Sequence, residues 1–167
     1  MNSIAHPVFG EVEIHPTDGI HWTKQLSVGN RGVAVDMTVE GSELATPAML
    51  DRVAPFVTRL SDFDSDARRS LRQNYEEGPD SPVAQYKEHH LEELSAEVVA
   101  AIFGKPKDAV DIDIFLSAAY LRRVGLYPTQ TDGCAAFDYT IGENATQYLM
   151  VVRFNADGEV SSIEMES

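Results

Sequence analysis

The stretch Tyr120-Leu121-Arg122-Arg123-Val124-Gly125-Leu126-Tyr127 opens the densest run of strand signals in this 167-residue chain. Three runs of the same kind follow, at Ala135–Ile141, Tyr148–Phe154 and Glu159–Met165. Aromatic and β-branched residues bounded by Gly, Pro, Asn and Asp favour strands. Because the connections are too short for parallel crossovers, residues 120–166 are expected to form a C-terminal antiparallel meander.

In two of these runs, the pattern of apolar and polar residues indicates which faces of the strand are buried. Phe137 and Tyr139 alternate with Asp138 and Thr140, which predicts a strand with one buried and one wetter face. The run Tyr148–Phe154 is apolar on both faces over most of its length, which is typical of a central strand.

The N-terminal part repeats this organisation on a smaller scale. Val8–His15, Ile20–Ser27 and Val33–Val39 are separated by turn residues, so residues 8–39 are expected to form an N-terminal three-strand meander. The single tryptophan, Trp22, is expected to anchor this part to the core, because an indole buries a large area. The sequence leaves open whether the two meanders join in one sheet.

Residues 46–119 carry helical periodicity. Thr46 before Pro47 is typical of a helix start, and Ser61 or Asp62 is a candidate cap for a second helix. Residues 78–82, Gly-Pro-Asp-Ser-Pro, form the strongest break, and a third helix is expected after them. Residues 108–119 fit a short helix, although 110–114 also fit a strand. The sequence therefore predicts a single α+β domain over 1–167, with a helical segment packed between two meanders.

Several of these segments together resemble a bacterial family of domains of unknown function, the family numbered two thousand and four. The resemblance rests on the segments 124–128, 137–142, 148–154, 157–158 and 165–167, on the opening Val8-Phe9-Gly10, and on Trp22. It covers both ends of the chain, and the middle is similar only in being helical. No motif in it is catalytic in type, so it implies a fold and a bacterial cytoplasmic setting but no active residues.

Composition narrows the classes of partner. The formal net charge of −14 disfavours nucleic acid and anionic membranes, which need clustered cations. No apolar run approaches the ~20 residues of a membrane helix, and the first residues carry neither the basic region nor the apolar core of a signal peptide. A cytoplasmic location, solubility through like-charge repulsion, and a basic protein partner are the expectations that follow. No cofactor is expected.

The strongest candidate for a chemical site is His89-His90 with Glu92 and Glu93. Histidine and glutamate three or four residues apart on a helix can share a metal ion. This is not the HExxH arrangement, and adjacent histidines point about 100° apart on a helix. An ordinary helix surface, with His90 at the edge of the core, is the simpler interpretation.

Other reactive residue types lack a supporting pattern. Cys134 follows a loop, where an exposed position is expected, and it reads as an ordinary thiol because no adjacent cation or helix start activates it. Arg68, Arg69 and Arg72 read as a solvated helix face. Asp36 and Asp138 would be able to work as an acid–base pair only if the fold brought them together.

Two functions of different class follow from this. The first is a non-catalytic protein-interaction domain, of which an immunity-type protein that covers a basic toxin enzyme is one form. The alternative is a small metal-dependent hydrolase that uses His89, His90, Glu92 or Glu93. The absence of any catalytic signature favours the first.

Overall fold

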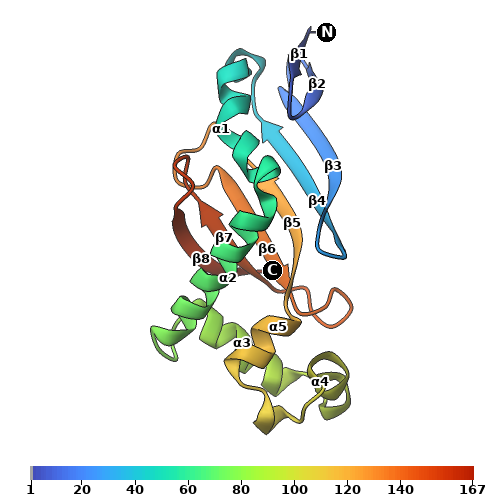
Figure 1. Ribbon diagram of the computed structural model, residues 1–167, viewed down its shortest axis with the longest axis vertical. Coiled ribbons are helices and arrows are strands. Elements are labelled where there is room, and N and C mark those ends of the chain that lie inside the picture. The colour runs from blue at the N-terminus through green and yellow to red at the C-terminus, as the bar shows by residue number, and fades with distance from the viewer. Residues whose placement is uncertain (1) are drawn as a thin grey trace.

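The computed structural model describes residues 2–167 and has the α+β class expected from the sequence. Within these residues, a six-stranded sheet has the strand order β3-β4-β5-β6-β7-β8, and a separate two-stranded hairpin pairs β1 with β2 (Figure 1). The strands are β1 (Asn2–His6), β2 (Gly10–Ile14), β3 (Ile20–Val28), β4 (Arg31–Val39), β5 (Tyr120–Leu126), β6 (Ala135–Thr140), β7 (Leu149–Phe154) and β8 (Val160–Glu166).

A parallel pairing joins the two ends of the chain. β4 runs parallel to β5, from Ala34 opposite Arg123 to Met37 opposite Leu126. Every other neighbouring pair in the large sheet is antiparallel, which confirms the C-terminal meander. The helical segment lies between β4 and β5 in the chain and makes the long crossover that a parallel pair requires.

The expected three-strand meander over residues 8–39 is wrong. β2 pairs with β1 along its whole length and belongs to a different sheet from β3, and an isolated bridge between His15 and Gly19 closes the turn that connects β2 to β3. The residues before Val8 supply the partner strand that the sequence pattern did not reveal. Trp22 attaches this hairpin to the large sheet: its Nε1 donates to the carbonyl oxygen of Phe9 at 3.1 Å, and the two rings meet edge to face. Trp22 therefore has the anchoring role expected of it.

The helices begin and end largely where the sequence indicates. They are α1 (Pro47–Thr58), α2 (Leu60–Glu76), α3 (Pro82–Glu93), α4 (Ala96–Phe103) and α5 (Ile112–Ala118).

Local chemistry explains most of these boundaries. The hydroxyls of Thr46 and Ser81 accept hydrogen bonds from backbone N–H groups of the first turns of α1 and α3. The expected cap at Ser61 or Asp62 is wrong, because α2 follows α1 directly after Arg59 and has no side-chain cap. Asp111 caps α5, which settles the ambiguity over residues 108–119 in favour of a helix.

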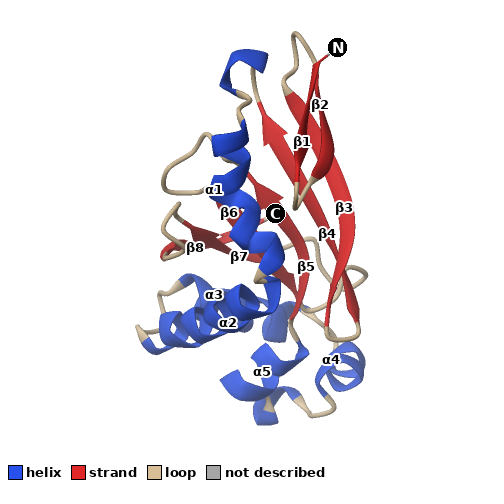
Figure 2. Ribbon diagram, turned by 45° about the horizontal axis from the view of Figure 1, so that its top comes forward, coloured by secondary structure: helices blue, strands red, loops and turns tan. Residues whose placement is uncertain are grey.

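Helices cover only one face of the large sheet. α1 and α2 lie along that face, and α3, α4 and α5 gather at one end of the molecule (Figures 1 and 2). Phe56 of α1 and Phe63 of α2 pack against Phe154, with ring centroids 5.7 and 5.3 Å away. Buried apolar residues from the helices, the hairpin and the sheet form one hydrophobic cluster. The opposite face of the sheet therefore has no helix to cover it.

One expectation about the C-terminal strands is wrong, because Asp138 and Thr140 are buried rather than wetter. The Asp138 carboxylate accepts a hydrogen bond from Arg123 of β5, and the Thr140 hydroxyl accepts one from the backbone N–H of Gly142. β7 pairs with β6 on one side and with the edge strand β8 on the other, so it is an interior strand of the C-terminal meander, as its apolar character predicts. Both of its faces carry buried residues, namely Met150, Val152 and Phe154 on one and Val151 on the other, and Arg153 pairs with Glu164 and Glu166 of β8.

Candidate binding surface

His90 is committed to the core of the protein and is not free to bind a metal. Its Nδ1 lies 2.7 Å from the carbonyl oxygen of Tyr86, so Nδ1 carries the proton and donates. Its Nε2 then accepts from the hydroxyl of Thr146 at 2.8 Å. Burial lowers the pKa of His90, and the hydrogen bond to Tyr86 opposes this effect. The ring is a neutral structural link between α3 and the loop before β7.

The other members of the expected cluster do not converge. The His89 ring packs edge to face against Tyr148, with centroids 5.2 Å apart, while Glu92 and Glu93 are exposed. Across residues 2–167, no group of three or more His, Cys, Asp or Glu side chains is placed to share a metal ion. The structure thus gives no geometric support to a hydrolase site at His89, His90, Glu92 and Glu93.

A hollow beside this helix has a different character. The groove between the end of α2 and α3, here called the α2–α3 groove, has a volume of about 620 Å³ and a largely apolar lining. Its lining residues are Tyr75, Glu76, Gly78, Pro79, Ala84, Lys87, Glu88, Leu91 and Glu92. Glu92, a candidate metal ligand from the sequence, therefore lines a groove, and it does so together with the ring of Tyr75 and without a histidine.

The turn between the two helices holds this groove open. Gly78 adopts a φ of 133°, which allows the chain to reverse directly after α2. The side-chain oxygen of Asn74 accepts from the backbone N–H of Val83 at 3.0 Å. Ser81 caps the same helix start. These bonds fix the start of α3 against the end of α2 and so set the position of the two helices on either side of the groove.

The charge of the groove is negative. Glu76, Glu88 and Glu92 line it and are exposed, and Lys87 is the one lysine or arginine among its lining residues. Glu76 has a distant partner in Arg72, at 3.7 Å, and neither Glu88 nor Glu92 forms an ion pair within residues 2–167. An apolar hollow edged with carboxylates suits a cationic side chain with an aliphatic stem.

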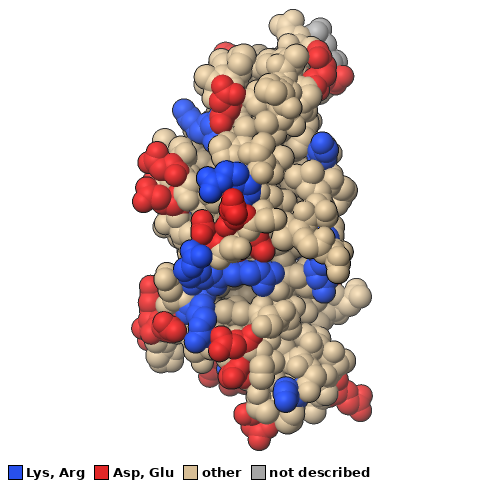
Figure 3. Space-filling view, viewed as in Figure 1, with Lys and Arg blue, Asp and Glu red and all other residues tan. Residues whose placement is uncertain are grey.

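The arginines of α2 are engaged within the protein. A hollow of about 490 Å³ between α2 and α5 is lined in part by Arg68, Arg69 and Arg72. Arg68 pairs with Asp64, Arg69 with Asp66, and Arg72 with Asp113 at 2.7 Å. Figure 3 shows the result as a short band of basic atoms with acidic atoms above and below it. Arg69 and Arg72 fit the expected solvated face, whereas Arg68 is half-buried and donates to the carbonyl oxygens of Leu116 and Ala119. Because all three arginines are paired with carboxylates, they form no phosphate site.

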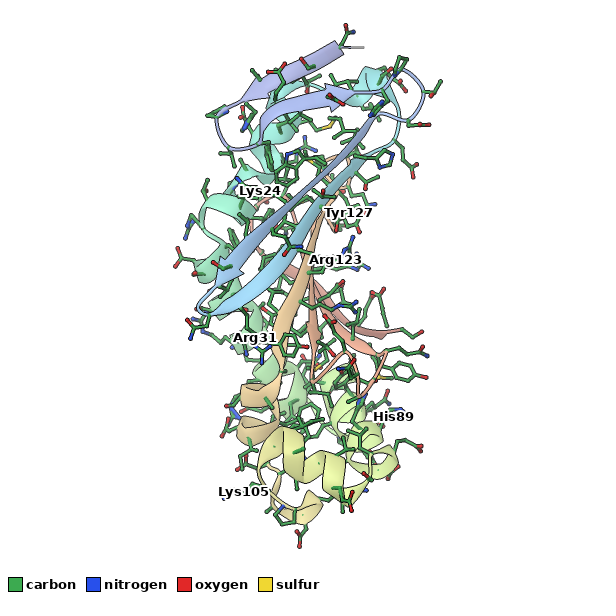
Figure 4. All side chains as sticks on the ribbon, turned by 90° about the vertical axis from the view of Figure 1, so that its right-hand side faces the viewer. Lys24, Arg31, His89, Lys105, Arg123 and Tyr127 are labelled. Atoms are coloured by element: carbon green, nitrogen blue, oxygen red, sulfur yellow. The ribbon has the colours of Figure 1, made fainter. Side chains whose placement is uncertain are left out.

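The helix-free face of the sheet carries a second polar cluster, centred on Arg123. Its guanidinium makes two hydrogen bonds to Asp36, at 2.6 and 2.7 Å, one to Asp138 at 3.2 Å and one to the hydroxyl of Tyr127 at 3.1 Å. Arg123 and Tyr127 point away from α1 and α2 (Figure 4). Gly125 makes room for them, because a Cβ there would lie 2.7 Å from the Tyr127 hydroxyl.

The fold thus brings Asp36 and Asp138 together, but not as an acid–base pair. Burial raises the pKa of Asp138, and the charge of Arg123 opposes the rise. The bonds to Asp36 raise the pKa of Arg123 above its already high value, so the guanidinium stays charged. Because one cation binds both carboxylates, the cluster links β4, β5 and β6 and does not hold a proton for exchange.

Cys134 is buried, contrary to the expectation of an exposed loop thiol. Its exposed fraction is 0%, and burial raises the pKa of its thiol to about 11. The residue directly precedes β6, so it enters the sheet core rather than the loop. Such a thiol is a packing residue and not a nucleophile.

Sequence reasoning missed Tyr75, Lys87 and Leu91 as surface-lining residues. Tyr75 of α2 and Leu91 of α3 are each only half-buried. The signal available was the break at residues 78–82, which places the two helix ends side by side.

Comparisons with known proteins add no relative: no family model, no curated protein and no solved structure matches the chain. Within residues 2–167, no helix combines the length and apolar character needed to cross a membrane.

Proposed function

We propose that this protein is a non-catalytic binding domain that takes a basic protein partner at the α2–α3 groove. In its specific form it is an immunity-type protein that covers a basic toxin enzyme. The observation that carries the proposal is the groove itself, in which an apolar floor with Tyr75 and Leu91 is edged by Glu76, Glu88 and Glu92.

The charge of the whole protein acts in the same direction. A net charge of −14 attracts a cationic partner over a distance and speeds the encounter. Long-range attraction alone does not select a binding place. The groove supplies what the bulk charge lacks, namely apolar surface that becomes desolvated on contact and carboxylates without a strong internal partner.

The arrangement of the candidate catalytic groups does not favour an enzyme. The rings and carboxylates expected to act together are separate, His90 is hydrogen-bonded at both nitrogens, and the Asp36–Arg123–Asp138 cluster is internally satisfied. A binding domain needs no such groups, and this arrangement is consistent with one.

The test measures binding of a capped peptide of alternating glycine and arginine by calorimetry, at about 50 mM and about 500 mM salt. The variant with Glu76→Gln, Glu88→Gln and Glu92→Gln is expected to lose roughly ten-fold in affinity at low salt, because three attractive pairs are removed. A peptide with glutamate in place of arginine is expected not to bind.

The matched control is the variant with Glu13→Gln, Glu97→Gln and Glu159→Gln. These exposed glutamates lie outside the groove, and the variant has the same net charge as the groove variant. Its affinity is expected to fall by no more than about two-fold. Equal losses in the two triple variants would overturn the groove as the binding place, and no binding of the arginine peptide at low salt would overturn the function.

A further inference from the structure

Inside the α2–α3 groove, Lys87 already occupies the position that a bound cation would take. Its ammonium lies 5.8 Å from the centroid of the Tyr75 ring, within the range of a cation–π contact. Across residues 2–167, no carboxylate oxygen lies within ion-pair distance of it. This is notable because Glu88 is its neighbour in the chain and Glu92 lines the same groove.

We infer that the groove recognises one arginine side chain of the partner on the ring of Tyr75, and that Lys87 blocks this place in the free protein. The inference rests on the proposed function and names the chemistry of the bound group.

The geometry of the groove favours an arginine over other cations. A guanidinium is planar, so it stacks on an aromatic ring and at the same time donates to carboxylates at its edge. Tyr75 supplies the ring, and Glu88 and Glu92 supply carboxylates without a competing ion pair. Ala84 and Leu91 provide apolar surface for the three methylene groups of an arginine stem.

Lys87 is suited to be displaced. It belongs to α3, on a flexible side chain of four methylenes, and within residues 2–167 its ammonium forms no ion pair that would hold it beside the Tyr75 ring. An incoming guanidinium would meet like charge as long as the ammonium stays. Lys87 therefore lowers the affinity of the free groove and rejects cations that cannot displace it.

The experiment titrates the protein with a capped glycine peptide that has one central arginine, followed through the ring signals of Tyr75 by NMR. The same peptide with citrulline, a neutral side chain of nearly the same shape, is the ligand control. The arginine peptide is expected to shift the Tyr75 signals, and the citrulline peptide is expected to leave them unchanged.

Three variants separate the ring from the charge. Measured by calorimetry, Tyr75→Leu is expected to bind the arginine peptide about three-fold more weakly than the wild type, and Tyr75→Phe about as well as the wild type. Lys87→Gln is expected to bind about three-fold more tightly. Lys24→Gln makes the same change of charge on β3, away from His89 of α3 in Figure 4, and is expected to leave the affinity within measurement error.

The outcomes distinguish this inference from the proposed function. Weaker or unchanged binding by Lys87→Gln, or equal gains from Lys87→Gln and Lys24→Gln, would overturn the role of Lys87. Unchanged binding by Tyr75→Leu would overturn the ring as the recognition element. In either case, a specific loss in the triple glutamine variant of the groove would leave the proposed function standing. If neither arginine peptide binds, both fail.

Discussion

Replacement of Arg123 by methionine is expected to destabilise the protein through the carboxylate that it leaves behind. Arg123→Met keeps much of the apolar stem and removes every guanidinium hydrogen bond. Asp36 loses its two bonds but is about a quarter exposed (26%), so water replaces part of what it loses. Asp138 is only 9% exposed, so water does not replace the hydrogen bond that it loses.

The magnitude follows from these exposures. Each charged hydrogen bond to Asp36 is discounted to about 0.5–1 kcal/mol, because both partners are partly solvated. A buried carboxylate left without its partner costs about 2 kcal/mol or more. The sum predicts a loss of about 3 kcal/mol in the free energy of unfolding near neutral pH, measured by urea denaturation with circular dichroism.

The loss is also expected to depend on pH, with a definite sign. Burial already raises the pKa of Asp138 above its unfolded value of 3.8, and removal of Arg123 raises it further. A carboxyl group with a raised pKa binds protons more readily in the folded state, so its unfavourable effect grows as the pH rises. The deficit of Arg123→Met is therefore expected to be smaller at about pH 5 than at about pH 8.

Two further variants test whether the unpaired carboxylate of Asp138 causes the loss of stability. Arg123→Met with Asp138→Asn is expected to be more stable than Arg123→Met alone, because the unpaired charge is gone. Arg122→Met removes only an exposed pair with Glu143 and is expected to cost less than about 1 kcal/mol. The explanation is refuted if Asp138→Asn gives no rescue, or if the deficit is the same at both pH values.

Two further predictions concern other positions. Because burial lowers the pKa of His90 below 6.5, the unfolded chain binds more protons, and wild-type stability is expected to fall as the pH drops below 6.5. His90→Asn, which also loses the hydrogen bond from Thr146, is expected to be less stable at pH 7 but to lose less stability as the pH falls. An equal loss for the variant and the wild type in urea denaturation would contradict this. Gly19→Ala is expected to cost more than about 3 kcal/mol, because φ is 77° and a Cβ would lie 1.9 Å from the carbonyl oxygen of Val39. Gly29→Ala, at φ 60° in open space, is its control and is expected to cost about 1–2 kcal/mol in thermal unfolding, so equal losses would refute the clash.

The candidate site was only partly predictable, for reasons visible in particular residues. Glu92 was recognised as a candidate on α3, but the partner assumed for it was His89, its neighbour along the helix. The groove instead places Glu92 with Tyr75, which comes from the preceding helix. Spacing along one helix shows which side chains share a face, and it does not show what an adjacent helix brings to that face.

Local patterns by themselves determined much of this protein. Alternation and turn residues located the C-terminal strands, starting from Tyr120. Thr46 and the break at residues 78–82 marked two helix starts, because these signals act over a few residues. The amino-acid composition by itself determined the strong negative charge.

Only the tertiary structure decided the strand order, the parallel pairing of β4 with β5, and which side chains meet at the surface. Arg123 and Asp36 are 87 residues apart in sequence and meet because β4 and β5 are neighbours. The pairing of β1 with β2 likewise depended on a weak strand that no alternation marked. Which strands pair, and which side chains then converge, is decided by the burial of one shared core, and that condition belongs to the whole chain rather than to any segment.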